Sequence, residues 1–184
     1  MKPGDRYSTE TRTLLDLVAY EVRALGLPAG SALLVRAATP ELHSDLQDRL
    51  PDYVLSGDIS GQPLAAVYLL SLETGQPGPD RDRPRHVVVA FRNRLSHKTL
   101  LYRAQRSVWY PAVERSLGRD YRLSGRWGLM APQRVGWLLA SAVANRLRRH
   151  DLAFFLADRA LLAPVERGRV RYFSSLGLLV GSRA

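Results

Sequence analysis

The sequence predicts an α+β fold: a single compact domain over residues 1–184, with a mixed, mostly antiparallel sheet of about five to seven strands packed by about three to five helices. Three observations lead to this prediction. Some segments carry apolar residues at helical spacing, and others are short, continuous apolar runs typical of strands. The two kinds alternate along the chain, yet one pair of runs has a hairpin signature, which favours antiparallel neighbours. The 184 residues are 46% hydrophobic and include no cysteine, so we expect a core without disulfides or cysteine-bound zinc.

The first part of the chain is expected to form a helix, a strand, a second helix and a strand hairpin, in that order. These elements are predicted at residues 9–25, 31–37, 39–50, 53–59 and 63–72. The hairpin prediction rests on Ser60-Gly61-Gln62, which separates the last two runs. Residues 75–84 (GQPGPDRDRP) are predicted to be a mobile loop, the one place where the domain could be subdivided.

The second part begins with the strand His86–Phe91, which contains three consecutive valines. Further predictions are a helix over 97–109, a second one after Pro111, an extended segment over 121–129 and a helix over 133–149. Because the last helix is apolar over more than half of its circumference, we expect it to be largely buried. The chain then continues with a strand or more helix at 152–156, a helical turn within 159–166 and a closing strand over 170–180.

Charge is distributed unevenly between the two parts. Residues 1–80 hold six basic and eleven acidic side chains, for a net charge of −5. Residues 81–184 hold 21 basic and six acidic side chains, for a net charge of +15. Such asymmetry points to a polyanionic partner for the basic part, or to two parts that pack together and neutralise one another.

The leading functional prediction is therefore a non-enzymatic nucleic-acid-binding protein that contacts the backbone of DNA or RNA through its arginine-rich second part. Arginines at helical or strand spacing would contact phosphates, and neighbouring aromatic rings would stack on bases. The candidate phosphate contacts are Arg103, Arg106, Arg122, Arg126, Arg148 and Arg149. The candidate stacking residues are Trp109, Tyr110 and Trp127. No sequence-reading motif accompanies them, so contacts to the phosphate backbone are expected.

Residues Gln133-Arg134-Val135-Gly136-Trp137-Leu138 support an alternative function. They open a helix after a predicted strand and resemble the pyrophosphate loop of GNAT-type acyltransferases, although Leu138 stands where that family prefers a small residue. The resemblance implies binding of acetyl-coenzyme A, a following strand at Leu152–Leu156 and Tyr172 as general acid. Whether residues 131–138 bind a cofactor phosphate is left open.

A third reading is a protein–protein interaction or scaffold protein with charge-asymmetric halves, which leaves a homo-oligomer open. No histidine pairing or hydrolase motif predicts a metal site or catalytic residues, and no cofactor is expected for the leading function. The apolar windows Leu64–Leu72 and Val135–Leu147 are too short to cross a bilayer, so we expect a cytoplasmic protein without a membrane partner.

Overall fold

The computed structural model describes residues 9–73, 79–95, 107–132, 135–158, 162–166 and 168–183. Seven strands form one mixed sheet in the order β2-β1-β3-β4-β7-β5-β6. Their bounds are Ala32–Ala37 (β1), Val54–Ser56 (β2), Ala65–Leu69 (β3), His86–Arg92 (β4), Arg122–Pro132 (β5), Leu162–Val165 (β6) and Leu176–Ser182 (β7). The predicted mixed sheet packed by helices is confirmed, with three parallel and three antiparallel pairings of the named strands.

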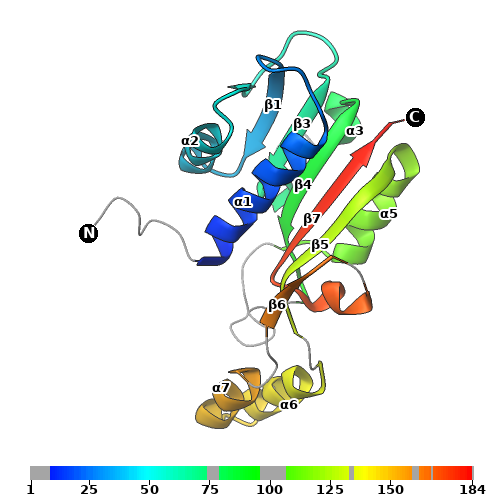
Figure 1. Cartoon of the computed structure of the whole chain (residues 1–184). Helices are drawn as coiled ribbons and strands as arrows, with labels where there is room; N and C mark the ends of the chain where they lie inside the picture. The colour runs from blue at the N-terminus through cyan, green and yellow to red at the C-terminus, as the bar shows by residue number, and fades with distance from the viewer. Residues whose placement is uncertain are drawn as a thin grey trace.

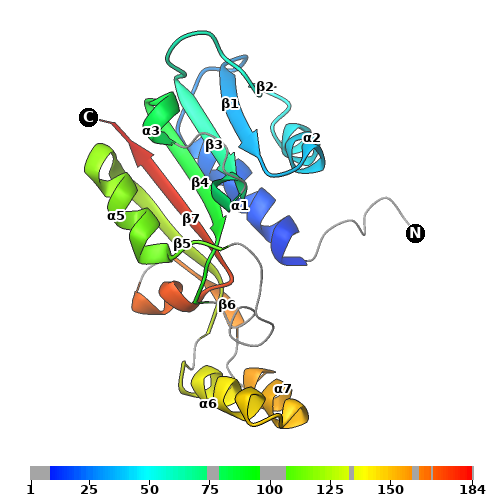
Figure 2. The ribbon, with the colours of Figure 1, turned by 180° about the vertical axis from the view of Figure 1, so that it is seen from behind.

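Helices cover both faces of the sheet (Figures 1 and 2). On one face, α1 (Thr9–Ala24) and α2 (Pro40–Arg49) enclose the larger apolar cluster with inward residues of the strands. On the other face lie α3 (Pro79–Asp82) and α5 (Tyr110–Asp120), and a second cluster forms around Tyr68, Phe91 and Tyr110. Helices α6 (Val135–Arg146) and α7 (His150–Asp158) pack on each other as a hairpin that stands away from the sheet.

The predicted helix near the N-terminus is confirmed by α1, and its burial follows directly from the sequence. Leu14, Leu15, Val18 and Val22 recur at helical spacing, and each is at most 1% exposed. Gly26, at a φ of +67°, and Pro28 follow the end of the helix, as expected.

The predicted hairpin of residues 53–59 and 63–72 is wrong. Both β2 and β3 pair with β1 in parallel, on opposite sides of it, so they do not touch. The five residues of β3 are all buried, which is typical of a central parallel strand covered on both faces. The turn signature was local and could not decide between a hairpin and a crossover.

Two other predictions differ from the structure. The helical turn predicted within 159–166 is replaced by β6 at its described residues, whereas residues 152–156, for which a strand or more helix is predicted, are helical in α7. The closing strand begins at Leu176, after a 3₁₀ turn over Arg169–Phe173. Of the helix predicted over 97–109, residues 97–106 lie outside the described residues, and Val108 forms an isolated bridge with Asn93.

The predicted mobile loop at 75–84 is only partly described: residues 79–82 form α3, and 75–78 lie outside the described residues. The helix predicted over 133–149 is present as α6, but the expectation that it is largely buried is wrong. Leu139 and Val143 are 52% and 57% exposed, because α6 contacts α7 on one side and does not pack on the sheet. No helix among the described residues is long and apolar enough to span a membrane.

A glycine lets β7 pass beneath the aromatic cluster. A Cβ at Gly177 would lie 2.4 Å from Cζ of Phe91 and 2.8 Å from Cδ2 of Tyr110. The two rings meet edge to face, with centroids 5.1 Å apart. Only glycine therefore fits here without moving a buried ring.

Candidate functional site

The four parallel strands β1 to β4 end at one edge of the sheet, which we call the carboxyl edge. The chain leaves β1 towards β2 on one side and later returns to β3 on the other side. The point between β1 and β3 is therefore a topological switch point. In open α/β sheets, ligands bind in the crevice outside the carboxyl ends of the strands at such a point.

Small residues form the turn that leads from β1 into α2. Ala37 ends the strand, and the backbone N–H of Ala38 donates to the carbonyl of Leu69 at 2.9 Å, which ties the turn to the end of β3. Thr39 is the N-cap residue of α2, but its side chain makes no capping hydrogen bond, and Pro40 opens the helix. The turn therefore presents short side chains and a helix N-terminus at the switch point.

Asp58 lies just beyond the end of β2, the strand that pairs with β1. Arg36 of β1 donates from Nη1 to the carbonyl of Gly57 at 2.6 Å, and the backbone N–H of Asp58 donates to the Ser56 hydroxyl at 3.2 Å. These two bonds hold the peptide unit that joins Gly57 to Asp58. The Asp58 side chain is exposed, and its carboxylate has no hydrogen-bond or ion-pair partner among the described residues. It is therefore a positioned acceptor that is available to a ligand.

Arg36 is itself held by an acidic residue on α3. It forms an ion pair with Asp82 at 3.3 Å, and Asp82 also accepts a 2.8 Å hydrogen bond from the Tyr68 hydroxyl. Burial, together with the hydrogen bond to the negatively charged Asp82, raises the pKa of Tyr68 far above its usual range. Tyr68 thus stays neutral, and the three side chains serve as a rigid support for the Gly57–Asp58 turn.

The end of β3 carries backbone strain. Leu70 is a buried non-glycine residue with a φ of +55°, and its N–H donates to the carbonyl of Ala90 at 2.8 Å. Leucine in the left-handed region is unfavourable, and residues of this kind cluster at ligand sites. This conformation directs the chain away from β3 at the switch point.

The end of β4 is occupied by structural contacts. The Asn93 amide donates to the carbonyls of Tyr172 and Ser174, at 2.7 and 3.0 Å, and its oxygen accepts from the backbone N–H of Tyr110 at 3.3 Å. Asn93 therefore fastens β4 to α5 and to the 3₁₀ turn before β7, and its amide is already engaged.

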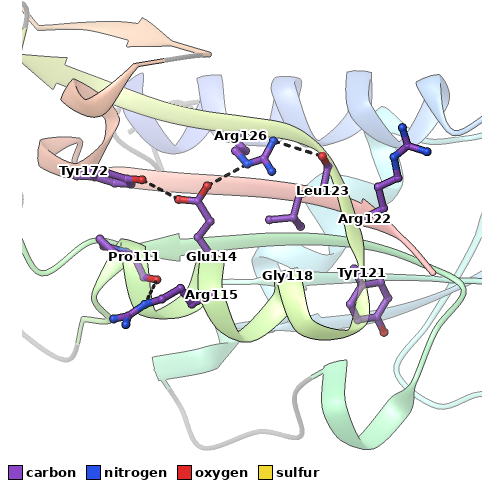
Figure 3. A pocket seen from close by; sticks show the side chains of 9 residues that line it. All are labelled: Pro111, Glu114, Arg115, Gly118, Tyr121, Arg122, Leu123, Arg126 and Tyr172. Atoms are coloured by element: carbon purple, nitrogen blue, oxygen red, sulfur yellow. Dashed lines mark hydrogen bonds and ion pairs between the residues drawn. The ribbon is translucent and has the colours of Figure 1, made fainter. Parts of the chain in front are cut away.

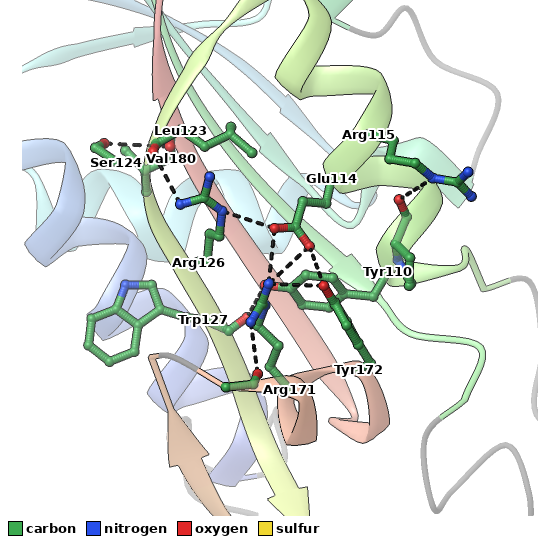
Figure 4. A network of polar contacts seen from close by, with 12 residues as sticks. Tyr110, Glu114, Arg115, Leu123, Ser124, Arg126, Trp127, Arg171, Tyr172 and Val180 are labelled. Carbon is green, nitrogen blue, oxygen red and sulfur yellow. Dashed lines mark hydrogen bonds and ion pairs between the residues drawn. The ribbon is translucent and has the colours of Figure 1, made fainter.

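A second polar cluster lies on the same face of the sheet as Tyr68 and α3, but beside β5, and is centred on Glu114 of α5 (Figure 4). Its carboxylate accepts from Arg126 at 2.9 Å, from Arg171 at 3.0 Å and from the Tyr172 hydroxyl at 3.1 Å. The Arg171 guanidinium also lies 4.6 Å from the centroid of the Tyr172 ring. Because Glu114 and Arg171 are largely buried, this network joins α5, β5 and the 3₁₀ turn.

A cavity of about 650 Å³ lies beside this network, between α5 and β5 (Figure 3). Arg115, Arg122 and Arg126 line it together with Tyr121 and Tyr172. Arg126 is engaged by Glu114, whereas the exposed Arg122 side chain has no partner among the described residues.

A smaller cavity of about 470 Å³ lies between α1 and β5 and contains Glu21. The Trp127 indole N–H donates to the Glu21 carboxylate at 2.7 Å. Burial raises the pKa of Glu21; the bond from Trp127 opposes this rise, and the charge of Glu166 adds to it. Trp127, predicted from the sequence to stack on a base, thus has its indole N–H bonded to Glu21.

The nucleic-acid residues predicted from the sequence do not form one surface. Arg122 and Arg126 share a cavity, but Arg148 and Arg149 lie in the turn between α6 and α7, beyond the opposite end of β5. A strand of 11 residues spans on the order of 35 Å. Tyr110 is 0% exposed and cannot stack on a base, whereas Trp109 is 46% exposed. Arg103 and Arg106 lie outside the described residues.

The residues at the carboxyl edge were missed as a site in the sequence. Asp58 had been placed in a hairpin, where it would have had no relation to the turn after β1. The signal that could have found it is its distance of about 20 residues from the end of β1, the spacing of ribose-binding acids in dinucleotide-binding folds.

Solved structures resemble this chain, whereas no protein-family model and no curated protein matches it. The plantazolicin methyltransferase BpumL, in complex with a triazolic desmethylPZN analog and SAH, aligns with a TM-score of 0.50 at 10% identity, over 98% of this chain and 88% of that one. A structure of BpumL with SAH aligns with a TM-score of 0.49 at 9% identity, over 96% and 86%. The MccD protein aligns with a TM-score of 0.42 at 10% identity, over 91% and 96%.

The prediction of a nucleic-acid-binding protein is contradicted by this finding, because the similar fold of known structure belongs to a methyltransferase that holds SAH. The same finding also contradicts the alternative predictions of an acyltransferase and of a scaffold protein. Two elements implied by the acyltransferase resemblance also differ: Leu152–Leu156 is helical, and the Tyr172 hydroxyl is bonded to Glu114 and Arg171.

Proposed function

We propose that the protein is a methyltransferase that binds S-adenosylmethionine at the carboxyl edge of its parallel strands. The observation that carries this proposal is the Asp58 carboxylate, which is exposed, held by its backbone and unpartnered among the described residues. It stands at the carboxyl end of β2, the strand beside β1, where an acidic side chain can accept hydrogen bonds from both hydroxyls of a ribose whose ligand enters at the switch point. The fold similarity to BpumL supports the same reading.

The residues around Asp58 fit an adenosyl cofactor that carries an amino-acid group. Ala37 and Ala38 leave room for a ligand to approach the backbone, which glycine-rich turns achieve in dinucleotide-binding folds. The N-terminus of α2 and the uncommitted Thr39 side chain offer hydrogen-bond donors to a carboxylate. S-adenosylmethionine supplies a methyl group on a positively charged sulfur, which needs no metal or acid to become reactive.

The chain's own contribution would then be binding and orientation. Asp58 holds the ribose, the Arg36–Asp82 pair holds the turn that carries Asp58, and strained Leu70 shapes the end of the neighbouring strand. Alignment of donor and acceptor is the main requirement of a methyl transfer, and rigid positioning can supply much of the rate enhancement.

The test is titration of the protein with S-adenosylhomocysteine, followed by calorimetry. We expect the wild-type chain to bind it and Asp58→Asn to bind at least tenfold more weakly, because a charged acceptor is lost. Asp52→Asn is the matched control, since this exposed aspartate lies before the other end of β2. Its affinity should equal that of the wild type.

Titrations with ATP and NAD make the test specific for the adenosyl-amino-acid group. Wild-type protein that fails to bind S-adenosylhomocysteine at millimolar concentration, or that prefers ATP or NAD, would refute the proposal. Equal affinities of Asp58→Asn and wild type would refute the assignment of the site.

A further inference from the structure

A further cavity lies at the edge of the sheet opposite to the carboxyl edge, where β4 and β5 begin and β7 ends. We call this the amino edge. The cavity has a volume of about 550 Å³, within the range of small-molecule sites. It is lined by Arg122, Leu123, Ser124, Ser182 and Arg183. Both charged residues are cations and two others carry hydroxyl groups, so every polar side chain of the lining can donate a hydrogen bond.

A β-bulge in β5 turns Arg122 towards this cavity. The pairing of β5 with β7 shifts at Ser124, which is an extra residue without a partner on β7. Arg122 pairs with Ser182 and Arg126 with Leu179, so four steps along β5 match three along β7. Because side chains alternate between the two faces of a strand, the odd step places Arg122 and Arg126 on opposite faces. Figure 3 accordingly shows Arg122 apart from Arg126 and its carboxylate partner.

No described carboxylate neutralises the two arginines of the cavity. Arg122 has no hydrogen-bond or ion-pair partner among the described residues. The Arg183 guanidinium lies 5.2 Å from the centroid of the Tyr121 ring, and no carboxylate of the described chain bonds to it. Asp120 precedes Tyr121 in the sequence but does not line the cavity. The lining therefore carries two positive charges and no negative one.

Ser182 is supported by a histidine on the neighbouring strand. His86, Ser182 and Arg122 are in register across β4, β7 and β5, and His86 Nδ1 lies 2.8 Å from the Ser182 hydroxyl oxygen. Burial, followed by the charge of Arg85, lowers the pKa of His86, so the ring is neutral at pH 7. A neutral ring with its proton on Nδ1 donates to the Ser182 oxygen, which leaves the hydroxyl proton for a ligand in the cavity.

We propose that this cavity binds the phosphate group of a small organic molecule, held by Arg122 and Arg183 with the hydroxyls of Ser124 and Ser182 as further donors. Arg183 follows Ser182 on β7, so it leaves the sheet on the face opposite to Arg122. A group at the amino edge thus meets one guanidinium from each face. The cavity is much larger than one phosphate group, which leaves room for the organic part beside Leu123.

The charge of the lining selects a phosphate monoester among anions. Such a group carries about −1.5 to −2 at neutral pH and has three strong acceptor oxygens, which match two cations and two hydroxyls. A carboxylate has one negative charge and two oxygens, so it would leave part of the lining without a partner. Each phosphodiester of a nucleic acid also carries a single charge.

The test is calorimetric titration of the full chain with phenyl phosphate at about pH 7.5, where this probe is mainly a dianion. We expect saturable binding to the wild type and about tenfold or more weaker binding to Arg122→Gln, because charge-assisted hydrogen bonds are lost. Arg119→Gln is the matched control: Arg119 is exposed like Arg122, carries the same charge and does not line the cavity. Its affinity should stay within about twofold of the wild type.

Arg122→Lys separates hydrogen bonding from charge alone. Lysine keeps the positive charge but lacks the fork of a guanidinium, so we expect a loss of several-fold, between the wild type and Arg122→Gln. Full retention of affinity in Arg122→Lys would contradict a built phosphate site, as would equal affinities of Arg122→Gln and Arg119→Gln.

Titrations with benzoate and with a short single-stranded oligonucleotide test the ligand class. Benzoate that binds as tightly as phenyl phosphate, an oligonucleotide that binds more tightly, or no binding of phenyl phosphate at millimolar concentration would each overturn the proposal. Asp58→Asn should bind phenyl phosphate like the wild type, since Asp58 lies beyond the other edge of the sheet. Failure of this proposal is therefore distinguishable from failure of the cofactor site.

Discussion

Helices α1 and α6 are both rich in apolar residues, but the structure uses them in opposite ways. The apolar residues of α1 that recur at helical spacing are buried against the sheet, whereas Leu139 and Val143 of α6 are more than half exposed. The difference arises from position: α1 crosses a sheet face, while α6 and its partner α7 extend from the end of β5. Apolar composition therefore indicates that a helix needs a partner, but not whether the same chain provides it.

The parallel and antiparallel regions of the sheet also differ in how fully their arginines are paired with carboxylates. In the parallel region, Arg36 and Arg49 are paired with Asp82 and Asp16. In the antiparallel region, Arg126 and Arg171 share the single carboxylate of Glu114, and Arg122 has no partner among the described residues. The charge asymmetry seen in the sequence is thus only partly neutralised within the fold.

The difference between buried and exposed apolar helix faces is tested most strongly by two Leu→Ala substitutions. Leu46→Ala removes a fully buried side chain of α2 and should lower the free energy of unfolding by about 2–5 kcal/mol. Leu139→Ala removes an exposed one and should change the stability of the monomer by less than about 0.5 kcal/mol. Urea denaturation at low protein concentration measures both. Equal losses would mean that α6 is buried within its own chain.

The Glu114 network provides the next largest effect. Glu114→Gln keeps the shape of the side chain but leaves the largely buried Arg171 without its charged partner, and should cost about 2 kcal/mol in urea denaturation. Arg122→Gln changes an exposed cation in the same cavity and should cost less than about 0.5 kcal/mol. If both variants lose the same stability, the network does not hold α5 to β5.

The smallest effect is a pH dependence at Glu21. Folding raises the pKa of the Glu21 carboxyl above its ordinary value of 4.5. The contribution of this group to the free energy of unfolding is therefore fully present below pH 4.5, and it is lost as the pH rises through the folded-state pKa. Glu21→Gln, which resembles the protonated form, should match the wild type at pH 4. It should be more stable by roughly 0.3 kcal/mol at pH 7, since solvent screens the half-exposed group. A gain of the same size at both pH values would contradict this origin.

The sequence predicted local elements well where their burial is decided locally. The repeat of Leu14, Val18 and Val22 and the valines of β4 specify a helix and a strand whatever lies beside them. Prediction from the sequence failed where the neighbouring segment decides the structure. The run around Val67 could pair with β2 or β1, and Leu152–Leu156 suited either a strand or a helix.

For the candidate site, residue types alone were misleading. Arginines and rings near one another in sequence suggested a phosphate surface, yet Tyr110 is buried and Trp127 bonds to a carboxylate 106 positions away. Asp58 is not among the site residues predicted from the sequence, because its importance comes from standing at the end of β2, the strand that pairs with β1.

The amino-acid sequence by itself therefore determined elements such as α1 and β4, the absence of disulfides and the separation of charge along the chain, because these depend on near neighbours and composition. Tertiary structure alone decided the strand order, the place of Asp58 at the carboxyl edge beside β1, the engagement of Arg126 and Arg171 by Glu114, and the exposure of Leu139 and Val143 on α6. Each of these depends on which distant segments meet, and apolar burial rewards many pairings almost equally until the whole sheet is assembled.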